Sequence, residues 1–359
     1  MSKVKAFLKR KDIVFSAKRY FIDAMSAMAQ GLFCSLLIGT IIKTLGQQLN
    51  LPFMVEMGGF ASAMAAPAMA IAIGYALKAP PLVLFSLAAV GQAANTMGGS
   101  GGPLAVFFIA IIAAEIGKAI SKETKVDILV TPFVTIFAGV LVSYAIAPPI
   151  GAVANAFGTL INHTTALQPF WMGIAVSVLV GIALTLPISS AAICHTFGLV
   201  GLAGGAAVAG CCAQMVGFAV MSFKENRWGG IVSQGLGTSM LQMGNIVRNP
   251  RIWIPPTLAS AVTGPIATCV FKLQMNGEPV NSGMGTCGLC GPIGVWTGWV
   301  APSEKAVEMF NAVAISPTAM DWIGLLLIAI VLPAVLTLLF AWPLRKMGWI
   351  KEGDLKLDL

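Results

Sequence analysis

Long apolar runs, separated by short breaks rich in charge, proline or glycine, make up most of the chain. A membrane-spanning helix needs roughly 20 apolar residues, and most of these runs approach or exceed that length. The runs that predict spans cover residues 21–44, 57–77, 82–97, 104–120, 128–147, 170–187, 252–272 and 321–343. The pattern predicts an all-α polytopic membrane protein with about ten membrane elements, two of them re-entrant hairpins.

The second half contains three broken stretches, at 187–198, 233–245 and 281–294, which are rich in glycine and uncharged polar residues. Backbone N–H and C=O groups in hydrocarbon need partners, so such stretches are tolerated only where they are buried in protein or line a wet cavity. Paired broken segments near the midplane are typical of transporter binding sites. We therefore expect re-entrant hairpins near 187–222 and 281–300, with no regular helix in the second.

Charged residues are few and are concentrated near the two ends. They make up 10% of the chain, against roughly 25% in soluble domains, and none lies between Asp127 and Lys224. This composition excludes a cytosolic enzyme, a nucleic-acid-binding domain and a disordered chain. Seven of the cations lie in the first 19 residues and four follow the last apolar run. Cytoplasmic flanks of spans are enriched in Lys and Arg, so both termini are expected in the cytoplasm.

These observations divide the chain into four predicted parts. They are a cytoplasmic interfacial amphipathic helix over 1–20, an N-terminal transmembrane half over 21–169, a C-terminal transmembrane half over 170–343 and a cytoplasmic tail over 344–359. Within the first half, the prolines at 148–149 predict the end of a span. The uncharged stretch 150–169 is then an outer loop or a shallow amphipathic segment.

Uncharged polar side chains in the broken stretches are the candidate binding groups, because hydroxyls and amides suit an uncharged, hydroxyl-rich solute. The substrate-binding candidates are Ser189, Ser190, His195, Gln234, Thr238, Gln242, Asn245, Asn281, Ser282 and Thr286. Two interpretations stay open for most of them. The serines at 189–190 either cap the next helix or contact solute, and the polar face at 234, 238 and 242 either lines a cavity or bonds neighbouring helices.

Other chemistry finds less support in the sequence. Cys287-x-x-Cys290 has the spacing of a metal site but lacks a second pair of ligands, so no metal and no cofactor are predicted. Trp253, Trp296 and Trp299 either stack on a sugar ring or belong to an interfacial aromatic belt. Gly98–Gly102 matches G-x-S-x-G, but that motif is meaningful only on a strand–turn–helix elbow. An intramembrane hydrolase would pair Ser100 with His195.

The run QGLGTSMLQMGN at 234–245, followed by RNPRIWIPP at 248–256, is the most specific part of the sequence. Together with GMGTCG at 283–288 and the segment 187–198, it resembles membrane subunit IIC (EIIC) of bacterial phosphotransferase-system sugar permeases. The resemblance covers nearly the whole chain and is closest to the branch that contains perfringolysin-regulator-type proteins. It implies a homodimer, a scaffold of helices and a second set with two re-entrant hairpins that carries the sugar in a rigid-body movement.

The sequence departs from that pattern in one respect that bears on function. Sugar-moving relatives commonly place a glutamate in a glycine-rich hairpin loop, whereas residues 283–294 contain no acid and Glu278 is the nearest. Any sugar phosphotransferase activity would need separate cytosolic EIIA and EIIB partners, so the chain is not expected to be catalytic by itself.

The sequence thus favours a permease of the bacterial plasma (inner) membrane that binds a sugar or similar polyhydroxy solute and moves it by alternating access. Its expected partners are the solute, the lipid bilayer, a second copy of the chain and an EIIB-type phosphocarrier, but no nucleic acid. The alternative is a membrane sensor or regulator on a permease fold, which binds a small molecule and signals with little or no transport.

Overall fold

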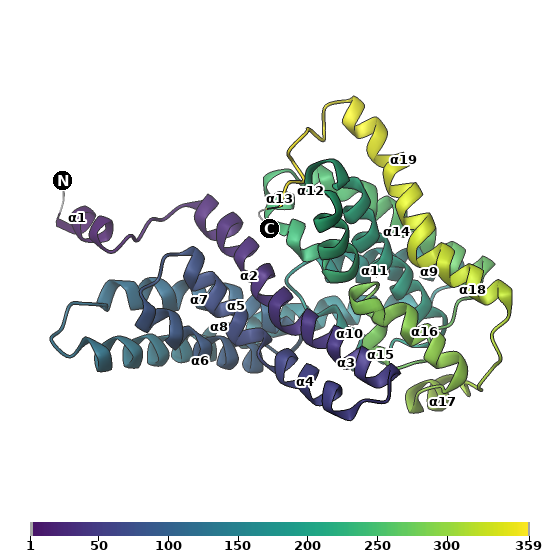
Figure 1. Ribbon diagram of the computed structural model, residues 1–359, viewed down its shortest axis with the longest axis horizontal. Coiled ribbons are helices and arrows are strands. Elements are labelled where there is room, and N and C mark those ends of the chain that lie inside the picture. The colour runs from purple at the N-terminus through teal and green to yellow at the C-terminus, as the bar shows by residue number, and fades with distance from the viewer. Residues whose placement is uncertain (1–2, 358–359) are drawn as a thin grey trace. The chain divides into compact units, whose positions relative to one another are not determined.

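The computed structural model describes residues 3–357, which form helices joined by short links, with one isolated β-bridge between Gly201 and Met275 (Figure 1). The chain divides into two compact units, residues 1–154 and 155–359. By length and composition, five helical stretches within residues 3–357 could cross a membrane, or six with a bent pair. The five are Arg19–Gln48, Pro81–Ile120, Asp127–Thr165, Gly201–Met221 and Ala319–Lys346. The all-α, multi-span class is therefore confirmed, while ten elements and cytoplasmic termini stay predictions.

Unit 1 begins with α1 (Lys3–Arg10) and an irregular link, so the helix expected over 1–20 is shorter than its segment. A 30-residue helical stretch follows and contains the predicted span 21–44. It consists of η1 (Arg19–Asp23), α2 (Ala24–Leu32), η2 (Phe33–Leu37) and α3 (Ile38–Gln48). The next predicted span is bent by 44° between α4 (Pro52–Ala63) and α5 (Ala65–Ala76).

The glycine run after residue 97 makes the turn that its composition predicts. α6 (Pro81–Gly98) and α7 (Gly102–Ile120) pack against each other, and the 3-10 turn η3 (Gly99–Gly101) joins them. Gly99 has φ +52°, a conformation that side chains disfavour. Ser100 therefore lies between two helices and not on a strand–turn–helix elbow.

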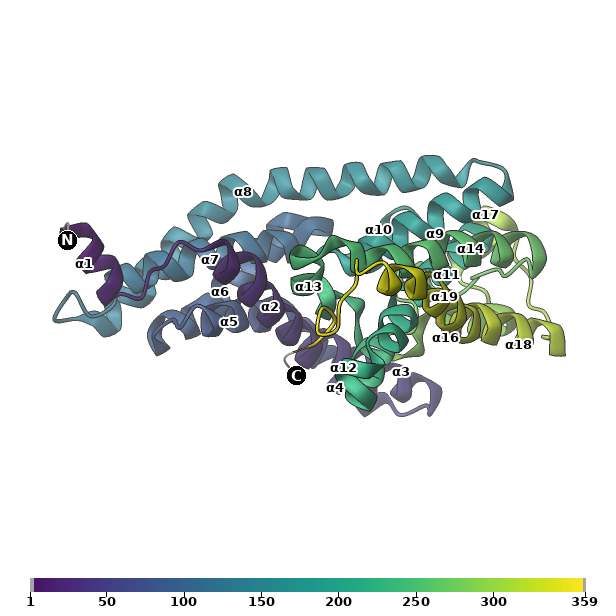
Figure 2. The ribbon, with the colours of Figure 1, turned by 90° about the horizontal axis from the view of Figure 1, so that it is seen from above.

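α8 (Asp127–Thr165) is one helix of 39 residues, shown as an uninterrupted ribbon in Figure 2. The predicted end at Pro148 and the loop over 150–169 are therefore wrong. Proline in a helix interior removes one N–H donor and strains the preceding turn, yet membrane helices tolerate it where the freed groups find other partners. Here the apolar, uncharged sequence on both sides continues the helix across Pro148 and Pro149. The boundary between the two units falls inside α8.

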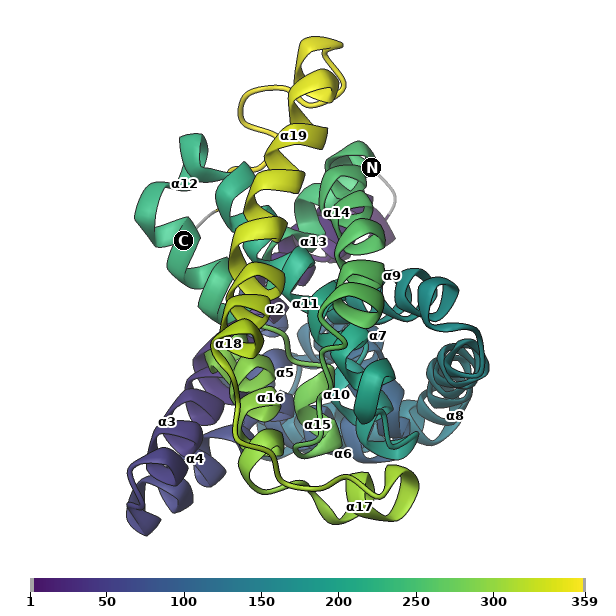
Figure 3. The same cartoon turned by 90° about the vertical axis from the view of Figure 1, so that its right-hand side faces the viewer.

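Unit 2 is built around α11 (Gly201–Met221), whose side chains are almost all buried. It packs against α9 (Pro169–Thr185), α14 (Ile254–Pro265) and α19 (Leu332–Lys346), and Figures 1 and 3 show α19 running beside α14 and α11. Small residues permit this close packing. A Cβ on Gly210 would lie 1.8 Å from the carbonyl oxygen of Ser177, so only glycine fits at that crossing.

The first expected hairpin takes an asymmetric form. α10 (Ser190–Thr196) has seven residues, and the link after it leads into α11, whose 21 residues are long enough to cross a membrane. Gly198 and Gly201, both with positive φ, make the turn that joins the two helices. The re-entrant hairpin over 187–222 stays a prediction.

The broken stretches after α11 form short helical pieces. Residues 223–253 fold into α12 (Phe223–Gly230), η4 (Ile231–Gly237), η5 (Ser239–Gln242), α13 (Met243–Arg248) and η6 (Pro250–Trp253). η7 (Ile266–Val270) extends α14. The second hairpin region contains α15 (Pro279–Ser282), η8 (Cys287–Leu289) and α16 (Cys290–Val300).

The prediction that no regular helix forms over 283–300 is half wrong. Positive φ values at Gly285, Gly288 and Leu289 break the chain as expected, but α16 then runs for 11 residues. α17 (Glu304–Phe310) follows. The predicted last span agrees with the 28-residue stretch of α18 (Ala319–Leu326), η9 (Leu327–Val331) and α19.

Candidate functional site

Two segments that the sequence predicts to be broken, around residues 190–201 and 275–283, are joined by hydrogen bonds in unit 2, and we call this contact the seam. The Ser190 hydroxyl donates to the carbonyl of Gly283 at 2.7 Å, and the Ser282 hydroxyl donates to the carbonyl of Leu199 at 2.6 Å. Gly201 and Met275 exchange two backbone hydrogen bonds of 3.0 Å beside them. The serines thus join α10 to α15 and satisfy carbonyls that the breaks leave free.

Two other hydroxyl candidates act as helix caps. Ser189 accepts from the N–H of Ala192 at 3.2 Å and starts α10. Thr238 accepts from the N–H of Met240 at 3.2 Å and starts η5. For Ser189 this is one of the two interpretations that the sequence leaves open.

The amide candidates form a buried cluster, which we call the amide cluster: Gln234, Gln242 and Asn245. Gln234 and Gln242 have no exposed surface and Asn245 is 7% exposed. Gln242 donates to Gln234 Oε1 at 2.9 Å and accepts from Asn245 Nδ2 at 2.8 Å. Gln234 also donates to the Ser222 hydroxyl at 2.8 Å. The single helix face expected for Gln234, Thr238 and Gln242 does not form, because Thr238 is extended and separates η4 from η5. Gln234 and Gln242 still meet in one hydrogen-bonded network.

The amide cluster binds the backbone of the chain's own C-terminal segment. Gln242 Nε2 donates to the carbonyl of Leu355 at 3.0 Å, and Asn245 Nδ2 donates to the carbonyl of Lys356 at 2.9 Å. Asn226 adds a pair of bonds, from its Nδ2 to the Leu355 carbonyl at 2.8 Å and from the Leu357 N–H to its Oδ1 at 2.9 Å. The Leu355 side chain is fully buried. The segment predicted as a plain cytoplasmic tail is therefore docked on unit 2.

The remaining candidates lie apart from the amide cluster. The His195 side chain is exposed and makes no hydrogen bond among the described residues, while the His195 carbonyl accepts from Lys305 at 3.3 Å. Thr286 is buried and its hydroxyl lies 3.6 Å from the sulfur of Met215. Asn281 is half-buried and packs against Gly294. Thr286 is still near the amide cluster, because it directly precedes η8, and η8 packs against η4, which carries Gln234.

A second buried polar network was not among the sequence candidates. The hydroxyls of Thr185 and Ser239 lie 2.8 Å apart, and Gln214 accepts from the Trp253 indole N–H at 2.9 Å. Gln214 also donates to Thr257 at 3.2 Å. Thr185 also donates to Gln214 at 3.4 Å, so this network connects α9, α11, η5 and α14 inside unit 2. A lone glutamine inside the apolar run 201–221 was the signal that could have indicated it, because a buried amide needs partners.

The cysteine and tryptophan motifs lie among other protein side chains. Cys287 and Cys290 are buried, and no three His, Cys, Asp or Glu side chains within residues 3–357 gather as metal ligands. Trp299 is 4% exposed and packs edge-to-face on Trp322, with ring centres 5.2 Å apart. Trp253 uses its N–H on Gln214, so it also has a protein partner.

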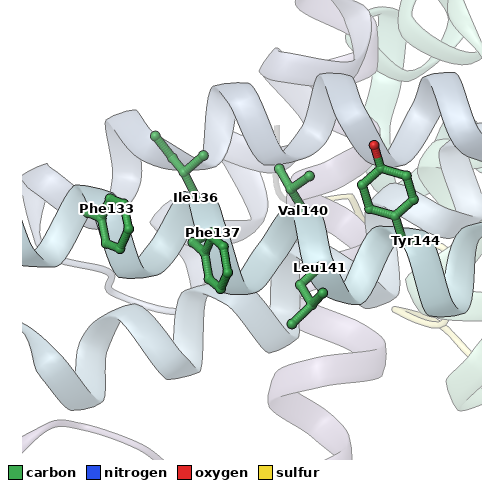
Figure 4. A pocket seen from close by; sticks show the side chains of 6 residues that line it. All are labelled: Phe133, Ile136, Phe137, Val140, Leu141 and Tyr144. Carbon is green, nitrogen blue, oxygen red and sulfur yellow. The ribbon is translucent and has the colours of Figure 1, made fainter.

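Each unit has an apolar cavity that is open at its surface. One of about 360 Å³ lies along α8, where Figure 4 shows Phe133, Phe137 and Tyr144 in a row with aliphatic neighbours. The other, about 530 Å³, lies in unit 2 between α12 and α19, with Trp228 and Trp342 among its walls. Their lining is mostly hydrocarbon, which suits lipid chains and offers a hydroxyl-rich solute few hydrogen bonds.

A comparison with known protein families gives a match along almost the whole chain. The family model described as "Phosphotransferase system, EIIC" matches residues 22–357. The chain belongs to the phosphotransferase-system EIIC family. No curated protein and no solved structure matches the chain. The EIIC chain is thus a sugar-permease-type, multi-pass membrane protein, which confirms the resemblance at family level, and the narrower branch stays a prediction.

Proposed function

We propose that this EIIC chain binds a sugar or similar polyhydroxy solute at the amide cluster and the adjoining seam, and moves it across the bacterial inner membrane by alternating access. The observation that carries the proposal is the amide cluster itself. Three carboxamides are buried in an apolar unit, and carboxamides offer both donors and acceptors to hydroxyl groups. No acid lies in residues 283–294, so recognition in this proposal is by neutral hydrogen bonds.

In this proposal the docked tail and the solute compete. The amide donors of Gln242 and Asn245 are held by the carbonyls of Leu355 and Lys356. A solute hydroxyl that uses the same donors displaces residues 355–356, and it exchanges hydrogen bonds of similar strength. The proposal also includes a homodimer of this chain and phosphorylation of the solute by an EIIB-type partner, because family membership suggests both.

The test measures binding and uptake with the same variants. Ser190, His195, Gln242 and Asn281 are each changed to alanine, with exposed His163→Ala as the matched control. We expect the Gln242 variant to weaken binding of candidate sugars to the purified protein by about tenfold or more, as removal of a bond to a buried amide does. The Asn281 variant, whose side chain is half-buried on α15, should weaken it less. Unchanged binding and uptake in all four variants would refute the site.

The alternative of a regulator is favoured by one observation, the acid-free hairpin at 283–294. Radiolabelled solute is counted in proteoliposomes with and without the phosphotransferase partners. Accumulation supports the permease. Solute binding without accumulation, under both conditions, supports the regulator.

A further inference from the structure

A cavity of about 330 Å³ in unit 1 is lined mainly by charged side chains. It lies where the link after α1, the turn between α5 and α6 and the end of α7 come together. Five of its lining residues are basic, and two are acidic. The basic ones are Arg10, Lys11, Lys78, Lys118 and Lys122. The cavity lies far from the amide cluster in sequence, and the proposed solute chemistry uses none of these residues.

Lys118 is the buried basic residue of the cavity lining. It is 1% exposed, and its ammonium group donates to the carbonyls of Asp12 at 2.8 Å and Leu77 at 3.0 Å. Its third partner is Glu115, also at 3.0 Å. These contacts use the three N–H groups of the lysine and join the three segments that surround the cavity.

Two cations at the rim share one carboxylate. Arg10 contacts Glu123 at 2.6 Å, and Lys11 contacts both Glu123 and the carbonyl of Ser121. The pKa of Glu123 is lowered from its usual range, first because Lys11 bonds its carboxylate. One carboxylate between two cations leaves positive charge uncompensated, and most of the guanidinium donors of Arg10 stay available.

Lys78 and Lys122 complete the lining without a direct ion pair, with Asp12 and Asp127 as the nearby carboxylates. Both side chains are exposed, and neither forms an ion pair within residues 3–357. Both also have positive φ, +56° and +62°. A left-handed conformation costs a residue with a side chain roughly 1–2 kcal/mol, which is why glycine or asparagine usually stands there. Asp12, a third lining residue, has φ +53°.

Lys78 and Lys122 each follow the end of a helix, where a left-handed residue closes the last turn. The turns hold both ammonium groups at the cavity, although glycine or asparagine would make them at lower cost. Unpaired lysines beside an arginine in a concave surface are the arrangement that recognises phosphate oxygens.

We propose that this cavity is a binding site for a phosphate-type oxyanion, with Lys78 and Lys122 as its principal charge donors and Arg10 as a further donor. The chemistry is shared by free phosphate or a phosphate monoester and by the headgroup of an anionic phospholipid. The two sources differ in whether the anion arrives from water or from the bilayer.

The test uses the full chain purified in neutral-lipid nanodiscs. In one arm, inorganic phosphate is titrated against chloride at constant ionic strength and the thermal midpoint is recorded. In the other arm, phosphatidylglycerol replaces part of the phosphatidylcholine. We expect at least one of these ligands to raise the midpoint, and the Lys78→Gln/Lys122→Gln variant to bind it at least about tenfold more weakly.

The control and a second variant keep the outcome clear. Lys9→Gln/Lys125→Gln removes the same charge from exposed lysines outside the cavity lining and should leave binding unchanged. Lys78→Asn/Lys122→Asn should lose binding while its unliganded midpoint rises, because asparagine tolerates positive φ. Protection by phosphate assigns a soluble anion, and protection by phosphatidylglycerol alone assigns a headgroup. Equal protection by chloride, or protection that the Gln and control variants share, would overturn the proposal.

Discussion

Replacing Gln242 by methionine tests whether the amide cluster holds the C-terminal segment. Methionine has nearly the length and volume of glutamine, so the change removes hydrogen bonds and leaves packing almost unaltered. Gln242 makes three bonds, of 2.9 Å to Gln234, 3.0 Å to the Leu355 carbonyl and 2.8 Å from Asn245. At roughly 1 kcal/mol of net stability for each bond, the expected loss is about 3 kcal/mol.

The loss should divide unequally between the cluster and the tail. Asn226 continues to donate to the Leu355 carbonyl, and Asn245 continues to donate to the Lys356 carbonyl. The Gln234 Oε1 atom loses the one partner that Gln242 supplied, and it is fully buried, so it accounts for the largest share. The variant should therefore be less stable, with a tail that is loosened but not released.

The assay is unfolding of the purified protein in mixed micelles, followed by hydrogen exchange over residues 349–357. Gln47→Met, at an exposed position of α3, is the matched control. We expect a clear fall in unfolding free energy and faster exchange of the tail in Gln242→Met alone. If both variants unfold alike and the tail keeps its protection, the hydrogen-bond reasoning is wrong.

Three further outcomes follow from the contacts. Leu355→Asp places a charge in a fully buried site, so trypsin should cleave the tail much faster than in the wild type. Arg345 lies 3.6 Å from the buried carboxylate of Glu225, and Arg345→Ala leaves that carboxylate without its ion pair. The free energy of unfolding should fall by about 3 kcal/mol, and by less in the Arg345→Ala/Glu225→Ala double variant. The hydrogen bond from Lys11 lowers the pKa of Glu123, so this contact stabilises the fold above about pH 4.5 and is lost as pH falls through the lowered pKa. Protection of residues 3–19 from hydrogen exchange should therefore fall only in that acid range. Glu123→Gln should abolish this pH dependence.

The spans could be predicted from sequence because hydrocarbon imposes a simple rule. A run such as 321–343 has no charge except Asp321 at its edge, and a helix is its only way to satisfy the backbone. A different rule, that proline ends a helix, misled at Pro148-Pro149. Proline predicts a break in water, whereas α8 continues through both prolines.

The candidate site could be predicted only in part. Polarity within apolar sequence correctly indicated that Gln234, Gln242 and Asn245 are buried together. It could not indicate that their partners are carbonyls more than 100 residues away, since backbone groups have no sequence signature. The same limit applies to Ser190 and Ser282, whose acceptors are the carbonyls of Gly283 and Leu199.

The two polar regions of this chain differ in what their groups still need. The amide cluster is satisfied within the protein, because its donors meet backbone carbonyls, so any guest exchanges one set of neutral bonds for another at little net cost. The basic cavity of unit 1 is not satisfied in the same way, since Lys78 and Lys122 form no direct ion pair among the described residues. A site of the first kind suits a guest that must enter and leave, whereas a site of the second kind suits an anion that stays. That difference is why binding at the two sites should respond differently to salt: screening weakens the anion site strongly and leaves hydrogen bonding at the amide cluster nearly unchanged.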